Sequence, residues 1–407
     1  MFDVHLVKVR GGKAMSRSAK AFFLIFLLCS IHIWAQDSDA VLQAFQKNFV
    51  RGNLTTKIQV LQDAILQSEI DMGPLYLQSL DFVIDNADIF ENDLVARELA
   101  VLSIRLIGLA GHRNALFPLW ELFVLDSTRT VRIEILNAIG GLIPIDNELV
   151  LNINGWLQTQ NEKLRRGEDV DAEVLEEAVV TLGKIGDDSS FPVLFTVSIL
   201  GGSNEIDEKA REALYSIEGD FKELILRVIE KNSLQEKLEA LRIGLANDDL
   251  FDRHKGQIAE VALKKGLYEQ TTQAADREFL RQLRYESIRV LTELSWSQAT
   301  TDAVAHFEKT LEEQAIGIGR TFHVIEAVEC LGSMASHEAA VRLALYLDIL
   351  NSDVENGKDV EDDIVLSVIR SLGALGDIVA FDYLLYAGYL DYSDSIKKAA
   401  RESLNRL

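Results

Sequence analysis

The chain has 407 residues, of which 48% are hydrophobic and 26% charged, and its formal net charge is −23. This composition is typical of a globular protein and excludes a largely disordered one. The negative charge repels phosphate backbones and anionic lipid surfaces, so we expect no nucleic acid partner and favour a basic or neutral one. Only four prolines occur, which favours long runs of helix.

The first residues have the features of a secretory signal in the usual order. Lys13, Arg17 and Lys20 supply positive charge before an apolar run, which the small Ala35 ends ahead of a polar stretch. The apolar run, about 15 residues long, is too short to cross a bilayer comfortably. We therefore expect residues 1–35 to be a signal peptide cleaved near Ala35, and the mature protein to be exported to the periplasm or the extracellular space.

Two alternatives to cleavage remain open. The apolar run could stay attached as an uncleaved membrane anchor, or Cys29 could carry a lipid, although Leu28 stands where lipoprotein signals have a small residue. Translation starts at either Met1 or Met15. No later segment approaches about 18 uninterrupted apolar residues, so we expect no transmembrane span in the mature chain. Its single cysteine, Cys330, allows no internal disulfide.

Helical patterns begin after the signal. Apolar residues recur at helical spacing in LTTKIQVLQDAILQ at 54–67 and in PLYLQSLDFVI at 74–84. These segments match the later repeats poorly, as the terminal cap of a repeat array does. We therefore predict an N-terminal helical cap over residues 36–92.

Internal repeats follow from residue 93 onward. The segment EEAVVTLGKIGDDSSFPVLF at 176–195 returns as LSVIRSLGALGDIVAFDYLL at 366–385. In both, an apolar helical pattern leads to Leu-Gly-x-x-Gly-Asp and then to a second apolar helix. Weaker copies of this pattern lie at 104–123, 131–142, 208–220, 324–345 and 395–404.

The stretch TLGKIGDDSSFPVLF at 181–195 could be a phosphate cradle, a metal loop or a turn between two helices. Gly183 allows a neighbouring helix to approach closely, and Gly186 allows a left-handed exit from the first helix. An acid or serine at 187–189 can cap the second helix, and Pro192 fits within its first turn. No phosphate-binding glycine motif accompanies the stretch. We therefore predict a turn between paired helices.

Two of the repeats carry a family resemblance. With GALGDIVAFDYLLYAGYLDYSDSIKKAARESL at 373–404 and VRIEILNAIGGL at 131–142, the chain resembles HEAT repeats, particularly the HEAT-like variety first named from phycobilisome lyase proteins. The resemblance implies an all-α, right-handed α-α superhelix, a HEAT/ARM-type solenoid of about ten helix pairs, over residues 93–407. The family is known for binding other macromolecules, and it has no shared active site to assign to this chain.

Acidic insertions separate several repeats, and stacking of the repeats would place them on one edge of the array. They occur at 161–173, 201–208 and 351–363. The last holds Asp353, Asp359 and Asp363, which are candidates for a partner surface, although solvated loops are the simpler interpretation. An EF-hand does not fit, because Gly357 is the fifth residue from Asp353 and the twelfth is Ile364. We expect no metal site.

Three tyrosines recur at a spacing of three in FDYLLYAGYLDY: Tyr383, Tyr386 and Tyr389. Tyrosine anchors interfaces well because it combines apolar area with a hydroxyl group. It also packs well beneath a terminal helix pair. Both interpretations, a partner surface and internal packing, remain open.

No pattern in the sequence indicates catalysis. The histidines lack metal-ligand spacing, no nucleophile motif occurs, and Cys330 lies near the apolar face of a helix, where a buried small side chain is expected. The acids are so abundant that they pair by chance at any spacing, so no catalytic pair can be chosen. We expect no cofactor and no enzymatic activity.

We therefore predict an exported, non-enzymatic scaffold that mediates protein–protein interaction in the cell envelope, with a protein or peptide partner, and a basic one in particular. The alternative is a binding module for an envelope polymer or small ligand, with the tyrosines as aromatic platforms. A hydrolase or lyase that uses unidentified carboxylates is a third hypothesis. The sequence indicates no oligomeric state.

Overall fold

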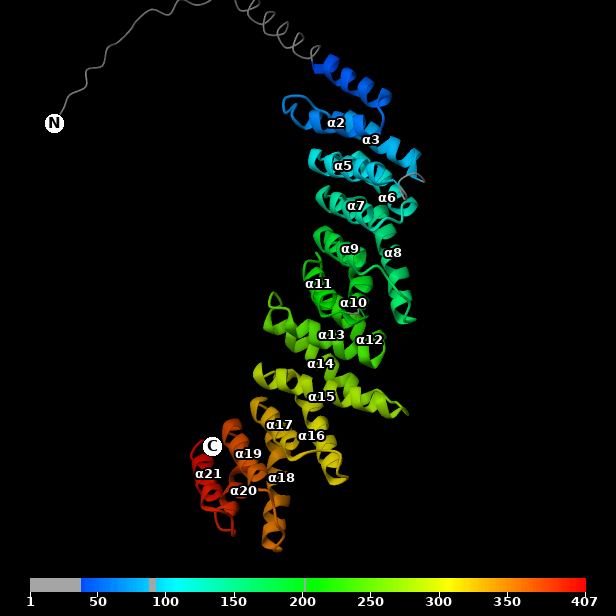
Figure 1. The fold of residues 1–407 in the computed structure, drawn as a ribbon. Helices are drawn as coiled ribbons and strands as arrows, with labels where there is room; N and C mark the ends of the chain where they lie inside the picture. Colours follow the sequence, from blue (N-terminus) through cyan, green and yellow to red (C-terminus); the bar gives the residue numbers. More distant parts are fainter. Residues whose placement is uncertain (1–37, 88–92, 201–202) are drawn as a thin grey trace, which may run out of the picture. The chain divides into compact units, whose positions relative to one another are not determined.

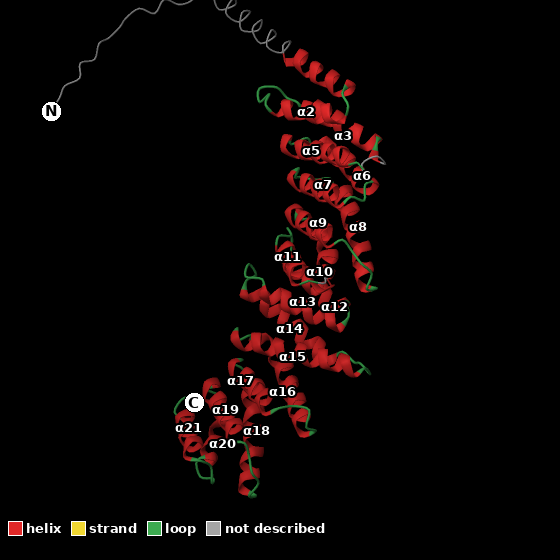
Figure 2. Ribbon diagram, in the orientation of Figure 1, coloured by secondary structure: helices red, strands yellow, loops and turns green. Residues whose placement is uncertain are grey.

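The computed structural model describes residues 38–87, 93–200 and 203–407, and their regular structure is entirely helical (Figure 2). The predicted signal peptide at 1–35 lies outside the described residues. None of the described helices is both long enough and apolar enough to cross a membrane. The predicted all-α fold class is confirmed for this part of the chain.

The helices form two compact units, the first ending at Ile217 and the second beginning at Glu218. After a helix at 38–51, the first unit contains α2 (Leu54–Ile65), α3 (Gly73–Asp85), α5 (Leu94–Ala110), α6 (Leu116–Leu125), α7 (Arg129–Gly141), α8 (Asn147–Arg165), α9 (Ala172–Ile185), α10 (Phe191–Leu200) and α11 (Asn204–Tyr215). The second unit contains α12 (Phe221–Lys231), α13 (Leu234–Ala246), α14 (Asp252–Tyr268), α15 (Ala274–Glu293), α16 (Thr300–Ala315), α17 (Thr321–Ser333), α18 (His337–Glu355), α19 (Asp362–Leu375), α20 (Phe381–Ala387) and α21 (Asp394–Leu404).

Within each unit, alternate helices pack side by side and so form two layers (Figure 1). One layer of the first unit runs α2, α5, α7, α9 and α11, and the other runs α3, α6, α8 and α10. In the second unit the layers are α13, α15, α17, α19 and α21, and α12, α14, α16, α18 and α20. This packing of each helix pair on the next is that of a helical repeat solenoid. The right-handed sense predicted for it stays a prediction.

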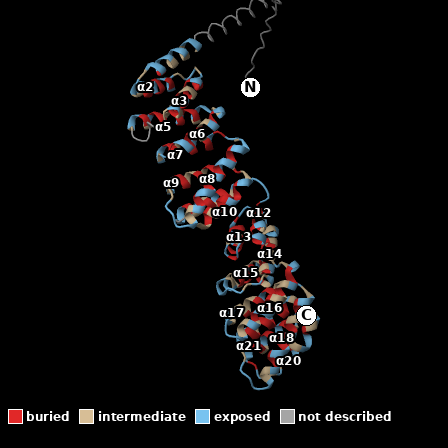
Figure 3. Ribbon diagram, turned by 90° about the vertical axis from the view of Figure 1, so that its right-hand side faces the viewer, coloured by how far each residue is buried: buried red, intermediate tan, exposed pale blue. Residues whose placement is uncertain are grey.

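The buried residues are mostly apolar and lie where helices pack on one another, whereas the exposed residues lie along the outer sides of the helices (Figure 3). In α9, for example, Val179 and Leu182 are fully buried, and in α19 Ile369 and Leu372 are fully buried. This burial is the main source of stability, because an isolated helix of this length is marginal in water.

The second unit repeats the first helix by helix, from α2 with α13 to α11 with α21. The tripeptide Ser-Ile-Arg occurs in α5 at 103–105 and in α15 at 287–289. Each arginine pairs with a glutamate on the next helix of its layer, Glu134 in α7 and Glu326 in α17. Because the two units correspond, a feature that occurs in only one of them is not required by their shared fold.

The predicted joint at 181–195 is confirmed as a turn between two helices. Helix α9 ends at Gly186, whose φ of 71° is left-handed, and a short 3₁₀ turn, η2 (Asp188–Ser190), leads into α10. The Asp187 carboxylate accepts a hydrogen bond of 2.9 Å from the Ser189 backbone N–H. Asp187 therefore caps the 3₁₀ turn that precedes α10, whereas the sequence pattern predicted a cap on the second helix itself.

Close helix contacts recur at the glycines of the repeat. A Cβ atom added to Gly183 would lie 2.9 Å from the Ala213 Cβ in α11, and one added to Gly373 would lie 2.7 Å from the Ser403 Cβ in α21. At the second contact the Ser403 hydroxyl also donates to the Ile369 carbonyl across the helices at 2.9 Å. Glycine is required here because only its missing side chain lets the helices approach so closely.

The described part of the predicted N-terminal cap, residues 38–87, belongs to the first unit by its packing. Helix α2 packs on α5, and α3 packs on α5 and α6. The terminal cap of a solenoid also packs on the repeats beside it, so the boundary predicted at residue 92 stays a prediction. The capping role of 36–92 stays a prediction.

Candidate functional site

The three predicted tyrosines lie on α20 and the turn that follows it. Tyr383 is half-buried in the core of the second unit, whereas Tyr386 is 39% and Tyr389 78% exposed. Phe381 and Leu385 on the same helix are also exposed. We call Phe381, Leu385, Tyr386 and Tyr389 the C-terminal aromatic surface. Tyr383 is therefore a packing residue, whereas the rings of Tyr386 and Tyr389 are exposed enough to contact a partner.

The predicted acidic residues do not lie in one loop. Asp353 belongs to the last turn of α18 and forms an ion pair of 2.6 Å with Lys358. Asp359 is exposed between α18 and α19, and Asp363 is exposed in the first turn of α19. The predicted insertion at 351–363 is therefore partly helical, and one of its three acids is already neutralised.

Polar contacts connect the tyrosines to α18. The hydroxyl group of Tyr386 is hydrogen-bonded to Glu355, and this bond, with burial and the charge of Asp348, raises the pKa of Tyr386. The Asn351 side chain donates to the Tyr383 carbonyl at 3.2 Å and accepts from the Tyr392 hydroxyl at 3.1 Å. The structure therefore brings the predicted tyrosines and the predicted acidic segment together at the contact of α18 and α20.

The first unit differs at the corresponding surface. Phe191 and Phe195 in α10 occupy the places of Phe381 and Leu385 in α20, and both are only 2% exposed. The corresponding side chains of the second unit are 42% and 38% exposed. An exposed aromatic group at this place is thus a property of the second unit.

A second cluster, which the sequence analysis missed, lies buried among α15, α16 and α17. Its centre is Arg284, which is 1% exposed and whose Nη2 pairs with the Glu313 carboxylate. The Tyr285 hydroxyl donates to the other oxygen of Glu313 at 2.9 Å, and the His323 ring stacks on Tyr285 with centroids 4.0 Å apart. Arg284 Nη1 lies 3.4 Å from the Nδ1 atom of His306. We call these five residues the Arg284 cluster.

The protonation states in the cluster follow from burial. Burial and the nearby Arg284 charge lower the pKa of His306 well below its usual 6.5, so its ring is neutral. Nδ1 then accepts from Arg284, and Nε2–H faces the Thr310 hydroxyl at 3.3 Å. Burial raises the pKa of Tyr285, and the charge of Glu313 raises it further, so the Tyr285 hydroxyl is also neutral. The cluster therefore holds one ion pair and two neutral hydrogen-bonding groups.

The first unit builds the same helices without this cluster. At the places of Arg284, Tyr285 and His306 stand Ala100, Val101 and Leu122. Ala100 and Leu122 are fully buried. Because a buried ion pair costs desolvation and an apolar replacement is often as stable, packing alone does not require the cluster. Aligning the sequences of the two units would have revealed the Arg284 cluster, whereas a motif search would not.

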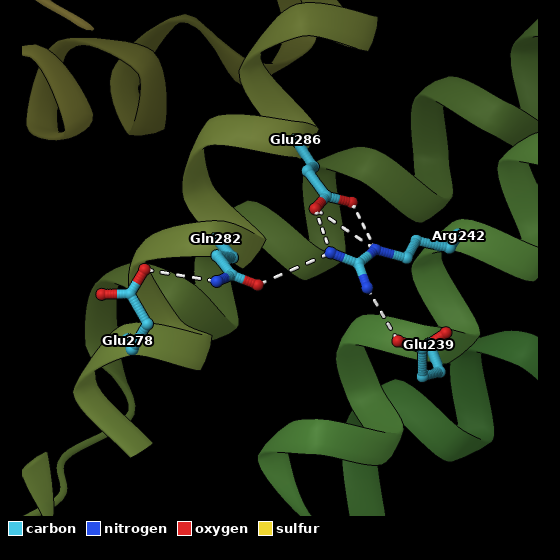
Figure 4. Close-up of polar contacts among 5 residues, drawn as sticks. All are labelled: Glu239, Arg242, Glu278, Gln282 and Glu286. Atoms are coloured by element: carbon cyan, nitrogen blue, oxygen red, sulfur yellow. Dashed lines mark hydrogen bonds and ion pairs between the residues drawn. The ribbon is translucent and has the colours of Figure 1, made fainter. Parts of the chain in front are cut away.

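A further ion-pair network lies on the solvent side of α13 and α15 (Figure 4). Arg242 binds Glu286 with both Nε and Nη2, at 3.0 and 2.6 Å, and Glu239 with Nη1 at 2.7 Å. Gln282 accepts from the same guanidinium at 3.5 Å and donates to Glu278 at 3.2 Å. These side chains are partly exposed, and their role is to connect neighbouring helices of one layer.

No group of three or more His, Cys, Asp or Glu side chains within the described ranges is placed to hold a metal ion. His112 lies between α5 and α6, whereas His337 is the first residue of α18, where its Nδ1 contacts Asp377 at 2.6 Å. Cys330 is fully buried, and burial raises its pKa to about 12. The prediction of a buried, small side chain at this position is confirmed.

Comparison with solved structures finds distant helical proteins. The chain is 16% identical to human deoxyhypusine hydroxylase in complex with glycerol, with 82% of this chain and 96% of that one covered and a TM-score of 0.26. A circular tandem repeat protein is 15% identical, with 90% and 95% covered and a TM-score of 0.23. No protein-family model and no curated protein matches the chain. At these TM-scores neither similarity bears on the activity of this chain. Its fold, a helical repeat solenoid, rests on the packing of its own helices.

Proposed function

We propose that the chain is an exported, non-enzymatic scaffold of the HEAT-like type, which binds a protein or peptide in the cell envelope. The C-terminal aromatic surface is the observation that carries this proposal. Tyr386 and Tyr389 expose ring area of the kind that anchors interfaces, and isolated apolar groups on a surface are common whereas grouped aromatic ones are not. The α-solenoid fold supports the proposal but does not by itself assign a function.

The charge around this surface favours a basic partner. Asp359 and Asp363 are exposed, and Glu355 lies against the Tyr386 hydroxyl. A Lys or Arg side chain of a partner can pair with such carboxylates and also pack on a tyrosine ring. The rim charges would set the rate of association, and the buried aromatic contact would set the lifetime of the complex.

Site-specific photo-crosslinking in the native envelope tests the proposal. A crosslinker at Tyr389 and one at Tyr386 should each capture the same partner, and a crosslinker at Leu109 should not. Leu109 is the matched control because it is an exposed apolar residue, 79% accessible, on α5 of the first unit. Equal capture at all three positions would contradict the assignment of the surface.

Charge reversal separates the acidic contribution from the aromatic one. The variant with Asp359→Lys and Asp363→Lys should reduce capture of a basic partner severalfold, and raising the salt concentration should reduce it in the wild type too. Capture that is unchanged by both would remove the acidic segment from the interface. Loss of a glycan ligand on Tyr386→Ala, with no protein captured, would favour the alternative of an envelope-polymer binding module.

A further inference from the structure

A pocket of about 620 Å³ lies within the second unit, where the end of α14 meets α15 and α16. Its volume is in the usual range for small-molecule sites. Leu280, Ile316 and Ile318 give it an apolar wall, and the Arg284 cluster lies at one side. Apolar walls with a few convergent polar groups are the common features of a ligand site.

The charges that line the pocket are unevenly paired. Among its acids, Glu269 is bound to the buried Lys237 at 2.7 Å, Glu313 is bound to Arg284, and Glu312 is exposed. The base Arg281 pairs with Glu278, which lies outside the lining, at 3.1 Å. Among its bases, Arg277 donates to the Thr272 carbonyl at 3.4 Å. Lys309 also lines the pocket and is exposed, and within the described ranges no acid lies in ion-pair distance of it. Arg277, Arg281, Arg284 and Lys309 thus line the pocket against three acids, so bases outnumber acids there, whereas acids outnumber bases in the chain as a whole.

Two guanidinium groups at the pocket have hydrogen-bond donors that are not used. The Nε–H groups of Arg281 and Arg284 are both buried and meet no acceptor among the described residues. Arg284 as a whole is 1% exposed, so water does not reach most of it. A buried donor without a partner is costly, and such donors occur where a ligand supplies the acceptor.

The first unit shows that the fold does not demand these charges. The corresponding residues are Asp93, Ala100 and Leu125 in place of Arg277, Arg284 and Lys309. Helix α16 is also longer than α6, with 16 residues against 10; its additional part carries Glu313, and Ile316 follows directly after the helix. The corresponding helix pair of the first unit therefore forms without these charges.

We propose that this pocket binds a small organic anion, a carboxylate attached to an apolar body. The carboxylate would lie against Arg281 and Arg284 near Lys309, and the apolar body would lie against Leu280 and Ile316. A carboxylate fits because its two oxygens match the planar fork of a guanidinium group. This binding site is separate from the C-terminal aromatic surface and does not depend on the scaffold function.

Calorimetric titration of the full chain with defined probes tests the proposal. Octanoate should bind at one site per chain, and octanol and octylamine, which share its apolar chain, should bind at least about tenfold more weakly. Lys309→Gln and Arg277→Gln should each weaken octanoate binding about three- to tenfold. The matched control is Arg253→Gln, at an exposed arginine of α14, which should leave binding unchanged.

The double variant Arg284→Ala with Glu313→Ala removes both partners of the buried pair together, and alanine is also the first unit's residue at the place of Arg284. Its circular dichroism should show a folded protein, and its octanoate binding should be lost. A leucine-ended peptide, with a free or an amidated C-terminus, distinguishes the source of the carboxylate. Binding of the free form alone assigns the site to a chain end, and binding of octanoate alone assigns it to a free acid.

Three results would overturn the proposal. These are equal binding of octanol and octanoate, unchanged octanoate binding in the variants that lack pocket charges, and absence of saturable binding for every probe. A failure here leaves crosslinking at Tyr389 unaffected, and a failure of that crosslinking leaves the titration unaffected. The two proposals are therefore tested independently.

Discussion

The Tyr392 hydroxyl donates a hydrogen bond of 3.1 Å to the side-chain oxygen of Asn351, and both residues are buried. Through the same side chain Asn351 also donates to the Tyr383 carbonyl, so that one amide ties α18 to α20 and to the segment before α21. In the first unit Asn161 makes the corresponding contact, to the Val193 carbonyl at 3.0 Å. The amide is thus a connecting element used in both copies.

Replacement of Tyr392 by Phe should destabilise the second unit by about 1–3 kcal/mol, because it leaves the fully buried Asn351 oxygen without a donor. Urea unfolding followed by circular dichroism measures the change. The control is Tyr268→Phe, which removes a hydroxyl bound to Asp302 at 3.0 Å from a side chain that is 60% exposed. Its expected cost is below about 1 kcal/mol, and an equal loss in both variants would contradict the role assigned to burial.

Glycine-to-alanine changes in the first unit should act with opposite signs. Gly183→Ala places a methyl group 2.9 Å from the Ala213 Cβ, and we expect a loss of about 1–3 kcal/mol from overpacking. Gly155→Ala, in the exposed interior of α8 with nothing within 4 Å of the new atom, should gain about 0.5–1 kcal/mol from helix propensity. Thermal unfolding of both variants checks the signs, and stabilisation by Gly183→Ala would disprove the close helix contact.

Two glutamates that pair with arginine should differ in their contribution to stability. Glu313→Gln leaves the buried Arg284 without its counter-charge, and we expect a loss of about 3 kcal/mol or more. Glu286→Gln weakens the pair with Arg242, whose side chain is 44% exposed, and should cost less than about 1 kcal/mol. Urea unfolding of the two variants in parallel gives the comparison, and similar losses would show that the Arg284 pair is effectively solvated.

The neutral state of His306 predicts a dependence of stability on pH. Its pKa is lowered in the folded chain, so the unfolded chain binds the extra proton as pH falls below about 6.5, and stability is lost from there downward until the folded pKa is reached. His306→Leu, which copies Leu122 of the first unit, should reduce this loss by up to about 1.4 kcal/mol per pH unit. His254→Gln is the control.

Unfolding free energies measured between pH 7 and pH 5 compare these two variants with the wild type. The wild type and His254→Gln should become less stable in parallel, and His306→Leu should follow a shallower curve. Parallel curves for all three proteins would mean that His306 gains its proton as easily in the folded state as in the unfolded one.

The helix pairs and their joints could be predicted from the chain because they depend on neighbours in sequence. The spacing of apolar residues sets the helices, and Gly186 with Asp187 sets the turn between two of them. The tyrosines and acids at the end of the chain were found as candidates by the same local patterns. Local patterns did not predict which of them would be buried: Tyr383 packs against the core, whereas Tyr389 is exposed.

By itself the sequence determined the all-helical repeat, its joints and its acidic character, because these follow from composition and from short-range periodicity. Only the tertiary structure decided which charges are buried. Arg284 and Glu313 lie 29 residues apart on different helices, and a search by spacing cannot select one pair among so many charges. Packing of α17 on both α15 and α16 excludes water around the Arg284–Glu313 pair. A charge left unpaired there would be costly, so each partner requires the other.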